Sequence, residues 1–255
     1  MLAVQNSVLL AILGGTLTTL LNAAGALPVL FIKRVSQRTL DVGLGFASGV
    51  MISASFTSLI IPGIKIGGAL PVLVGIALGS MIVSAADRFI PHIHAVIGNE
   101  GGVAITGRLK AVWLFAIAVT IHNMPEGLAV GVGYGSEKIA EATALAIAIG
   151  LQNIPEGMSI GFSILSVKGV SRKKAFLASF LSGAVELPLA IIGAAATSFA
   201  KPIIPYAMGF AAGAMLFVVS DEMIPETHRI GHERLASYGL IAGLIMMLAL
   251  DVILG

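Results

Sequence analysis

The sequence predicts an all-α membrane protein with eight transmembrane helices and an inverted repeat. Its composition, the spacing of its apolar runs and two pairs of similar segments lead to this prediction. Of the 255 residues, 57% are hydrophobic and 11% are charged, whereas soluble domains carry roughly 25% charged residues. This balance excludes a soluble fold, and the 31 glycines suit close packing of helices in lipid.

Eight apolar runs approach the roughly 20 residues that a helix needs to cross a bilayer. The runs cover residues 5–32, 40–61, 66–86, 111–134, 141–165, 174–199, 203–223 and 236–254. The first run follows no basic residue and continues too far for a signal peptide, so it is interpreted as a membrane helix. The longest connection, 87–110, contains His92 and His94 and is expected to be a flexible cytoplasmic loop. No segment is long enough for a separate soluble domain, so residues 1–255 are expected to form one transmembrane domain.

The basic residues are distributed unevenly between the connections. Twelve of the fifteen Lys and Arg residues lie in the first, third, fifth and seventh connections, and Lys65, Lys138 and Lys201 lie in the others. The positive-inside rule assigns the basic side to the cytoplasm, so both termini are predicted to lie outside it. The chain has no Cys, which excludes disulfides and thiolate metal ligands. Its compact form fits a bacterial inner membrane.

Two pairs of segments repeat within the chain. Residues 116–127 read AIAVTIHNMPEG and residues 146–157 read AIAIGLQNIPEG, with the shared residues in one register. Residues 45–51 (GFASGVM) are echoed by residues 209–215 (GFAAGAM), and an Ile-Pro pair follows each of these two segments. The helices of each pair run in opposite directions, so helices 1–3 are predicted to be related to helices 6–8, and helix 4 to helix 5. Inverted repeats of this kind are typical of secondary transporters, with the site near the midplane.

Each Asn-x-Pro-Glu-Gly motif places a carboxylate four residues after an imidazole or an amide, on one helix face. An ionised side chain at the centre of a lipid-facing helix costs about 2.5–3.5 kcal/mol, and no intramembrane Lys or Arg is available as a partner, so the two faces should turn toward each other. The expected pocket is lined by His122, Asn123, Glu126, Gln152, Asn153 and Glu156. The three amide side chains would either bind an ion or form hydrogen bonds across the helices.

Two further features extend this pocket. Pro125 and Pro155 lack an N–H, which should kink each helix and free a carbonyl one turn earlier. Glu186, beside Pro188 in the sixth predicted helix, adds a carboxylate, and Met51 would add a thioether. Carboxylates with an imidazole suit zinc and its first-row neighbours better than magnesium or calcium. Three carboxylates would neutralise more than one divalent ion, so the pattern indicates two adjacent ions.

A second cluster of polar residues lies at the cytoplasmic end of the seventh predicted helix. Its members are Asp221, Glu222, Glu226, His228 and His232. An exit route for cations and a solvated helix end explain this cluster equally well, and both interpretations stay open. His92 and His94 are only two residues apart, which is more typical of loop polarity than of a metal site.

At its paired motifs the sequence resembles the ZIP family of zinc and iron transporters, particularly the bacterial GufA-like branch, and the resemblance covers essentially the whole chain. The resemblance implies a binuclear metal centre. One ion would be held by Met51, His122, Glu126, Gln152 and Glu156. The other would be held by Asn123, Glu126, Asn153, Glu156 and Glu186. Gln152 stands where many relatives have His, and Asn153 stands where some have an acid, which weakens the second position in particular.

The resemblance also implies a function. Family members bring metal into the cytoplasm, the helices that carry the site slide as a unit against the second, third, seventh and eighth helices, and dimers are common. We therefore expect zinc transport, with cadmium, iron and manganese as other cargoes.

Two alternatives remain. One is an intramembrane metalloenzyme in which His122 and Glu126 hold a hydrolytic zinc. No His-Glu-x-x-His motif is present, and a symmetric duplication favours a pathway over an asymmetric catalytic site, so an enzyme is not expected. The other alternative is a channel-like conduit or a carrier that exports metal.

Overall fold

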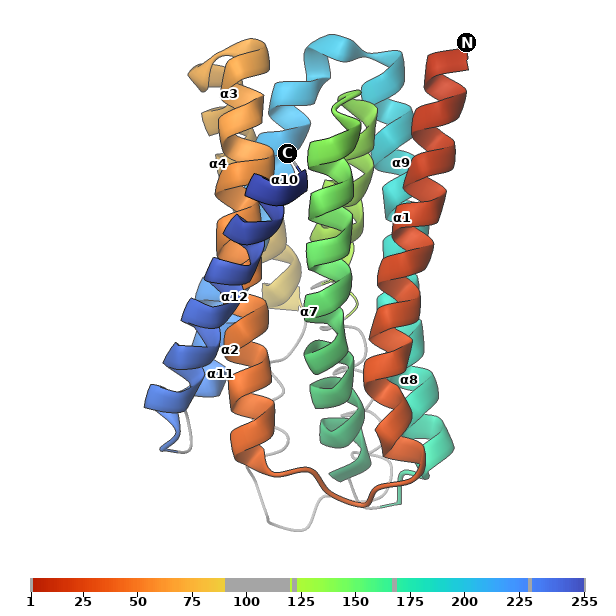
Figure 1. The fold of residues 1–255 in the computed structure, drawn as a ribbon, viewed down its shortest axis with the longest axis vertical. Coiled ribbons are helices and arrows are strands. Elements are labelled where there is room, and N and C mark those ends of the chain that lie inside the picture. The colour runs from red at the N-terminus through yellow and green to blue at the C-terminus, as the bar shows by residue number, and fades with distance from the viewer. Residues whose placement is uncertain (1, 90–119, 121–122, 167–168, 229–230, 255) are drawn as a thin grey trace.

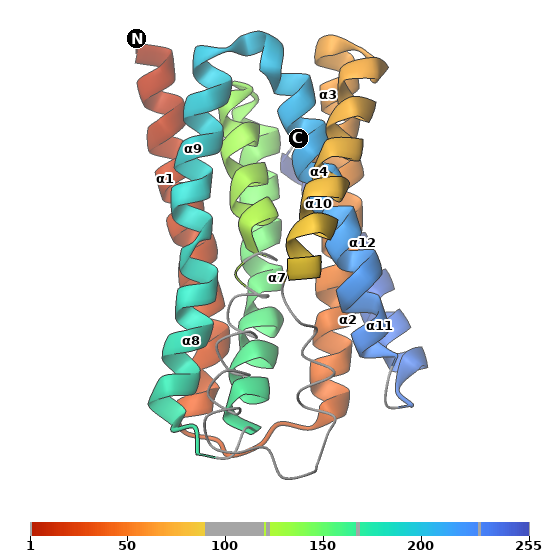
Figure 2. The ribbon, with the colours of Figure 1, turned by 180° about the vertical axis from the view of Figure 1, so that it is seen from behind.

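The computed structural model describes residues 2–89, 120, 123–166, 169–228 and 231–254. Within these ranges every regular element is helical and no strand is present. Figure 1 shows the longer helices standing side by side along one axis, and Figure 2 shows the same bundle from behind. Six helices of the described part are long and apolar enough to cross a membrane. The predicted class, an all-α membrane protein, is confirmed.

The helices follow the predicted apolar runs closely. In chain order they are α1 (Leu2–Ala26), α2 (Gln37–Ala54), α3 (Ile61–Gly67), α4 (Ala69–Phe89), α7 (Ile139–Ser166), α8 (Arg172–Ala184), α9 (Glu186–Phe199), α10 (Ile204–Val218), α11 (Ile224–Thr227) and α12 (Glu233–Leu254). Residues 123–135, which precede α7, are also helical. Short 3-10 turns follow α1 (Leu27–Leu30) and precede α10 (Lys201–Ile203). Most of the predicted fourth span before residue 123, and most of the predicted loop 87–110 with His92 and His94, lie outside the described residues.

Helices α2 and α12 approach each other so closely that only glycine fits between them. A Cβ at Gly49 would overlap the carbonyl oxygen of Leu240, and Gly45, Gly239 and Gly243 meet the facing backbone in the same way. Contacts between small residues four apart bring helix backbones together in lipid, where van der Waals packing drives association. At these four positions the two helices have no room for a side chain.

Helices α4 and α10 form a second pair of the same kind. A Cβ at Gly213 would overlap the carbonyl oxygen of Ile76, and Gly75, Gly79 and Gly209 are equally close to the facing helix. The repeated segments 45–51 and 209–215 thus supply equivalent glycines to equivalent contacts. In Figures 1 and 2, α2 and α10 run in opposite directions. These observations support the inverted repeat, which stays a prediction for the chain as a whole.

The remaining long helices form another group. Helix α1 packs on α7, α8 and α9, and a Cβ at Gly131, in the stretch 123–135, would overlap the carbonyl oxygen of Ala190 in α9. We call α1, α7, α8, α9 and residues 123–135 the site group, and α2, α4, α10 and α12 the scaffold group. Among the labelled helices, α7 provides most of the contact between the two groups, against α2 and α12. At this boundary a Cβ at Gly43 would lie 2.7 Å from Cβ of Pro155.

Helices α2 and α10 each continue into a π-helical segment, η2 (Ser55–Ile60) and η4 (Val219–Met223). The first begins four residues after Met51 and the second four residues after Met215, so the two segments occupy equivalent places in the repeat. An Ile-Pro pair follows each segment at Pro62 and Pro225. Because proline has no N–H, a carbonyl one turn earlier loses its helical partner. The apolar pattern does not predict these segments, and the two Ile-Pro pairs are their signal in the sequence.

The predicted span 174–199 is broken near its middle. Helix α8 ends at Ala184 and α9 begins at Glu186. Pro188 explains the break, because its ring clashes with the carbonyl four residues earlier, that of Ala184. The break places Glu186 in the first turn of α9, where the helix dipole favours a carboxylate. By contrast, α7 continues as an α-helix through Pro155.

Candidate metal centre

The two copies of the Asn-x-Pro-Glu-Gly motif contact each other inside the bundle. Glu126, in the stretch 123–135, and Gln152, in α7, are both fully buried. Nε2 of Gln152 donates a hydrogen bond of 2.7 Å to Oε1 of Glu126. A hydrogen bond to a carboxylate is stronger than one between neutral groups, so this contact fixes the two motifs against each other.

Asn153 links α7 to Glu186 at the start of α9. Its Nδ2 lies 2.8 and 2.9 Å from the two carboxylate oxygens of Glu186 and 3.3 Å from the carbonyl oxygen of Thr18 in α1. Because all three oxygens are acceptors, the Asn153 amide must present its NH₂ to them. Its Oδ1 then faces Gln152, whose Nε2 is 3.5 Å away.

Several buried polar atoms at this centre have no hydrogen-bond partner. In the part of the chain that the structure describes, these atoms are Oε2 of Glu126, Oε1 of Gln152 and both amide atoms of Asn123. Buried polar groups are hydrogen-bonded in the great majority of cases, so oxygens of this kind suit a site that takes up a cation. Glu156 lies one helical turn after Gln152 and is also buried.

The rest of the predicted ligand set is placed less completely. His122 lies outside the described residues. Met51 is fully buried in α2, in the apolar cluster that also contains Leu145 and Ile149 of α7. Among the described His, Asp and Glu residues, no three side chains are grouped so that they could hold a metal ion. A metal at this centre would therefore depend on amide oxygens as well as carboxylates, with His122 adding an imidazole.

The contact between Gln152 and Glu126 leads to a prediction. We expect Gln152→Leu to weaken divalent metal binding about tenfold, because loss of a group that orients a metal ligand costs roughly 10- to 100-fold in affinity. Calorimetric titration of the purified protein with Zn²⁺ measures this change. Gln37→Leu is the matched control, because Nε2 of Gln37 also donates to a carboxylate, Oδ1 of Asp41, at 2.8 Å, but at the start of α2. Equal affinity in the two variants would show that Gln152 orients no ligand.

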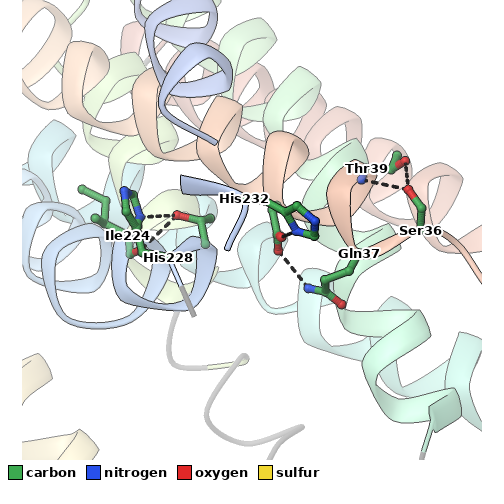
Figure 3. A network of polar contacts seen from close by, with 8 residues as sticks. Ser36, Gln37, Thr39, Ile224, His228 and His232 are labelled. Carbon is green, nitrogen blue, oxygen red and sulfur yellow. Dashed lines mark hydrogen bonds and ion pairs between the residues drawn. The ribbon is translucent and has the colours of Figure 1, made fainter. Parts of the chain in front are cut away.

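The predicted exit residues directly follow α10 in the chain. Asp221 and Glu222 are part of η4, and Glu226 is part of α11. Figure 3 shows His228 folded back on Ile224, with Nδ1 of the ring 2.8 Å from the carbonyl oxygen. This nitrogen therefore carries the proton, since a carbonyl only accepts. Asp221 and His228 are exposed, and the exit route and the solvated helix end both stay open.

His232 makes a contact of a different kind. Its Nδ1 lies 2.9 Å from Oδ2 of Asp41, a buried carboxylate near the start of α2 that also accepts the hydrogen bond from Gln37. Figure 3 shows His232 and Gln37 side by side. The contact joins the beginning of α12 to the beginning of α2 and adds a polar attachment to the glycine contacts between these helices.

Helix α1 brings polar residues to the centre that the motif pattern does not predict. Thr18, Thr19 and Asn22 are buried against α7, α8 and α9. Thr18 and Asn22 are four residues apart and share one helix face. Four polar residues close together in a largely apolar stretch, Thr16, Thr18, Thr19 and Asn22, are the sequence signal that could have identified this face.

These helices and this centre define a multi-pass membrane protein that buries carboxylates and amides between its spans. The sequence model of the ZIP Zinc transporter family matches residues 94–251. Zinc transporter ZIPB of Bordetella bronchiseptica is 40% identical over 96% of this chain and 81% of its own length. Zinc transporter GufA of Myxococcus xanthus is 37% identical over 96% of this chain and 97% of its own, and human zinc transporter ZIP11 is 36% identical over 100% of both. The chain belongs to the ZIP zinc transporter family, as the resemblance predicted.

Proposed function

We propose that this protein transports zinc across the membrane through the centre between residues 123–135, α7 and α9. The hydrogen bond between Gln152 and Glu126, which joins the two copies of the motif, is the observation that supports this function most directly. The relatives described above are named zinc transporters. Their names also favour transport over the alternative of an intramembrane metalloenzyme. Cadmium, iron and manganese are further candidate cargoes, because similar ligands serve these metals.

The proposed centre holds two adjacent ions in unequal positions. The first would be bound by Met51, His122, Glu126, Gln152 and Glu156. The second would be bound by Asn123, Glu126, Asn153, Glu156 and Glu186. The NH₂ of Asn153 donates to Glu186, so only Oδ1 of this amide is available to an ion. A neutral amide oxygen is a weaker partner for a cation than a carboxylate, which supports weaker binding at the second position.

The movement proposed for transport is an elevator-type displacement of the site group against the scaffold group. Glycine contacts hold α2 to α12 and α4 to α10, so these pairs suit a rigid frame. His122 lies outside the described residues, and of the other predicted ligands all except Met51 belong to the site group. A body that carries most of the ligand set is able to take the ion with it when it moves.

Direction and surroundings are part of the same proposal. Residues 1–255 would form one transmembrane domain in a bacterial inner membrane, with both termini outside the cytoplasm and metal moving inward. The uneven distribution of Lys and Arg supports this orientation. Both termini lie in the upper half of the bundle in Figure 1, which is compatible with their being on one side of the membrane. A homodimer is the assembly that we propose.

Metal flux into proteoliposomes tests the function. The purified protein is reconstituted with a zinc-sensitive dye inside the vesicles, and zinc, cadmium, iron or manganese is added outside. We expect the dye to respond to zinc with wild-type protein and to remain at the level of protein-free vesicles with His122→Ala. No flux with wild-type protein would contradict transport, whereas undiminished flux with His122→Ala would contradict the assignment of the centre.

The boundary between α2 and α7 gives a prediction about movement. We expect Gly43→Val to slow zinc flux several-fold while zinc affinity stays unchanged, because the new side chain would press on Pro155 across the sliding boundary. Flux is compared with calorimetric zinc binding. Gly150→Val is the control, since its side chain would meet the flexible end of Leu21 inside the site group. Equal slowing in both variants, or weaker zinc binding in Gly43→Val, would contradict a sliding boundary at Gly43.

A further inference from the structure

Helix α1 presents a polar face to the helices that carry the centre. Thr18, Thr19 and Asn22 are all buried, and Asn22 is only 1% exposed. An apolar helix packs in lipid without any polar residue, whereas a buried polar group without a partner costs about 1–3 kcal/mol. The partners of these three residues therefore indicate what the polar face does.

The first partner is the break between α8 and α9. The carbonyl oxygen of Gly183, in the last turn of α8, accepts from the backbone N–H of Val185. Oγ1 of Thr19 donates to the same oxygen at 3.2 Å. Thr19 thus adds a second donor that ties α1 to the end of α8, three residues before Glu186.

The second partner is the main chain of α8 before the break, beside the motif in α7. Nδ2 of Asn22 donates to the carbonyl oxygen of Ser179 at 2.8 Å. Its Oδ1 has no hydrogen-bond partner among the described residues and packs against Gly157, where a Cβ would be 2.6 Å away. Gly157 directly follows Glu156, so Asn22 holds α8 and α7 at a fixed separation beside both glutamates.

The third partner is Asn153. The carbonyl oxygen of Thr18 accepts from Nδ2 of Asn153 at 3.3 Å, and the same NH₂ contacts both oxygens of Glu186. The carbonyl of Thr18 therefore helps to set the amide plane, and the amide in turn sets the rotation of the carboxylate. The Thr18 side chain itself donates to the carbonyl oxygen of Gly15 at 3.1 Å, so Thr18 acts on the surroundings of Glu186 through its main chain.

We infer that Thr18, Thr19 and Asn22 are positioning residues for the metal centre. They hold the broken end of α8 and the amide of Asn153 so that the Glu186 carboxylate faces the pocket. The inference rests on the proposed transport function, and it assigns to α1 a part in shaping the second ion position. None of the three residues needs to touch the ion.

A double-mutant experiment tests the inference. Thr19→Val keeps the shape of the side chain and removes the hydroxyl, Thr19→Ser keeps the hydroxyl, and Thr16→Val makes the same substitution at a half-buried site in the same helix. Each variant is titrated with Zn²⁺ by calorimetry and assayed for zinc flux, both alone and together with Glu186→Gln.

We expect Thr19→Val to lower zinc affinity about three- to tenfold, which is the range for one buried hydrogen bond. The loss should be confined to the ion position that Glu186→Gln abolishes. Thr19→Ser should have the zinc affinity of the wild type, and so should Thr16→Val. In the Glu186→Gln background, Thr19→Val should not lower the zinc affinity any further. A general loss of packing would instead lower affinity in both backgrounds.

Other outcomes overturn the inference. The inference is wrong if Thr19→Val binds zinc with wild-type affinity, or if the effects of Thr19→Val and Glu186→Gln on zinc affinity are independent. It is also wrong if Glu186→Gln binds and transports zinc normally. If Thr19→Val is not obtained as a folded protein, Asn22→Ala replaces it, because this substitution removes the hydrogen bond of 2.8 Å from Nδ2 to the carbonyl oxygen of Ser179 in α8. Wild-type protein that carries no zinc would instead contradict the proposed function.

Discussion

Replacing Glu156 by Gln is expected to reduce zinc flux at least about 100-fold. In the proposed centre this carboxylate serves both ions, and Gln keeps its size while removing its charge. Substitutions of groups that merely orient a metal ligand already cost roughly 10- to 100-fold, and loss of a shared anionic ligand should cost more. Zinc flux into proteoliposomes, measured at several zinc concentrations, gives the loss.

Glu141→Gln is the matched control for this prediction. Glu141 lies in the first turn of the same helix, α7, and its partner is Lys138 at 2.9 Å, with both side chains more than a third exposed. An exposed ion pair contributes only about 0–1 kcal/mol, so flux should stay at the wild-type level. If Glu156→Gln transported zinc as well as Glu141→Gln, the centre would have to lie elsewhere.

The second large effect is expected in stability. In Gly49→Ala the new methyl group would overlap the carbonyl oxygen of Leu240 and approach the backbone N–H of Leu244. Backbone atoms of a helix have no freedom to move aside, so α2 and α12 would have to separate. Overpacking of this kind costs about 1–3 kcal/mol, and the separation would also remove contacts along both helices. The thermal unfolding midpoint of the detergent-solubilised protein should therefore fall by several degrees.

Gly133→Ala provides the comparison. At this position the nearest atom to a new Cβ is Cβ of Ala142 at 3.3 Å, so a shift of only a few tenths of an ångström makes room for it. Alanine favours a helix over glycine by about 1 kcal/mol, so this variant should be as stable as the wild type or more stable. Because both substitutions carry the same gain in helix propensity, the difference between them isolates the contact of α2 with α12. Equal midpoints would show that the two helices do not depend on that contact.

The positions of the helices and of the central polar residues could be predicted because they follow from composition and spacing. A run of apolar residues near the length of a bilayer has few alternatives to a membrane helix, and α4 and α7 fall within a few residues of the predicted spans. The repeated motif also directed attention to Glu126 and Gln152, which the structure places in contact. The roles of these residues in metal binding stay a proposal.

Local departures from the α-helix could not be predicted in the same way. The two π segments and the break at Val185 depend on how individual carbonyls find partners once proline has removed an N–H, and hydropathy carries no information about this. The polar face of α1 was missed for a related reason. Thr19 has a role because the carbonyl of Gly183 lies next to it, and that carbonyl belongs to a helix far away in the sequence.

The π segments after α2 and α10 have a consequence for how these helices respond to a deletion. Each residue turns an α-helix by about 100°, and a π turn accommodates one extra residue within a helix. Removing a single residue from the α-helical part, Gln37–Ala54, would therefore rotate everything beyond it by more than a quarter of a circle. Gly63, which packs against Val72 and Met208, would then point away from them. Removing one residue from Ser55–Ile60 would instead turn the π segment into an α-helix and leave everything beyond it in phase. A deletion in the π segment should therefore be tolerated better than a deletion in α2.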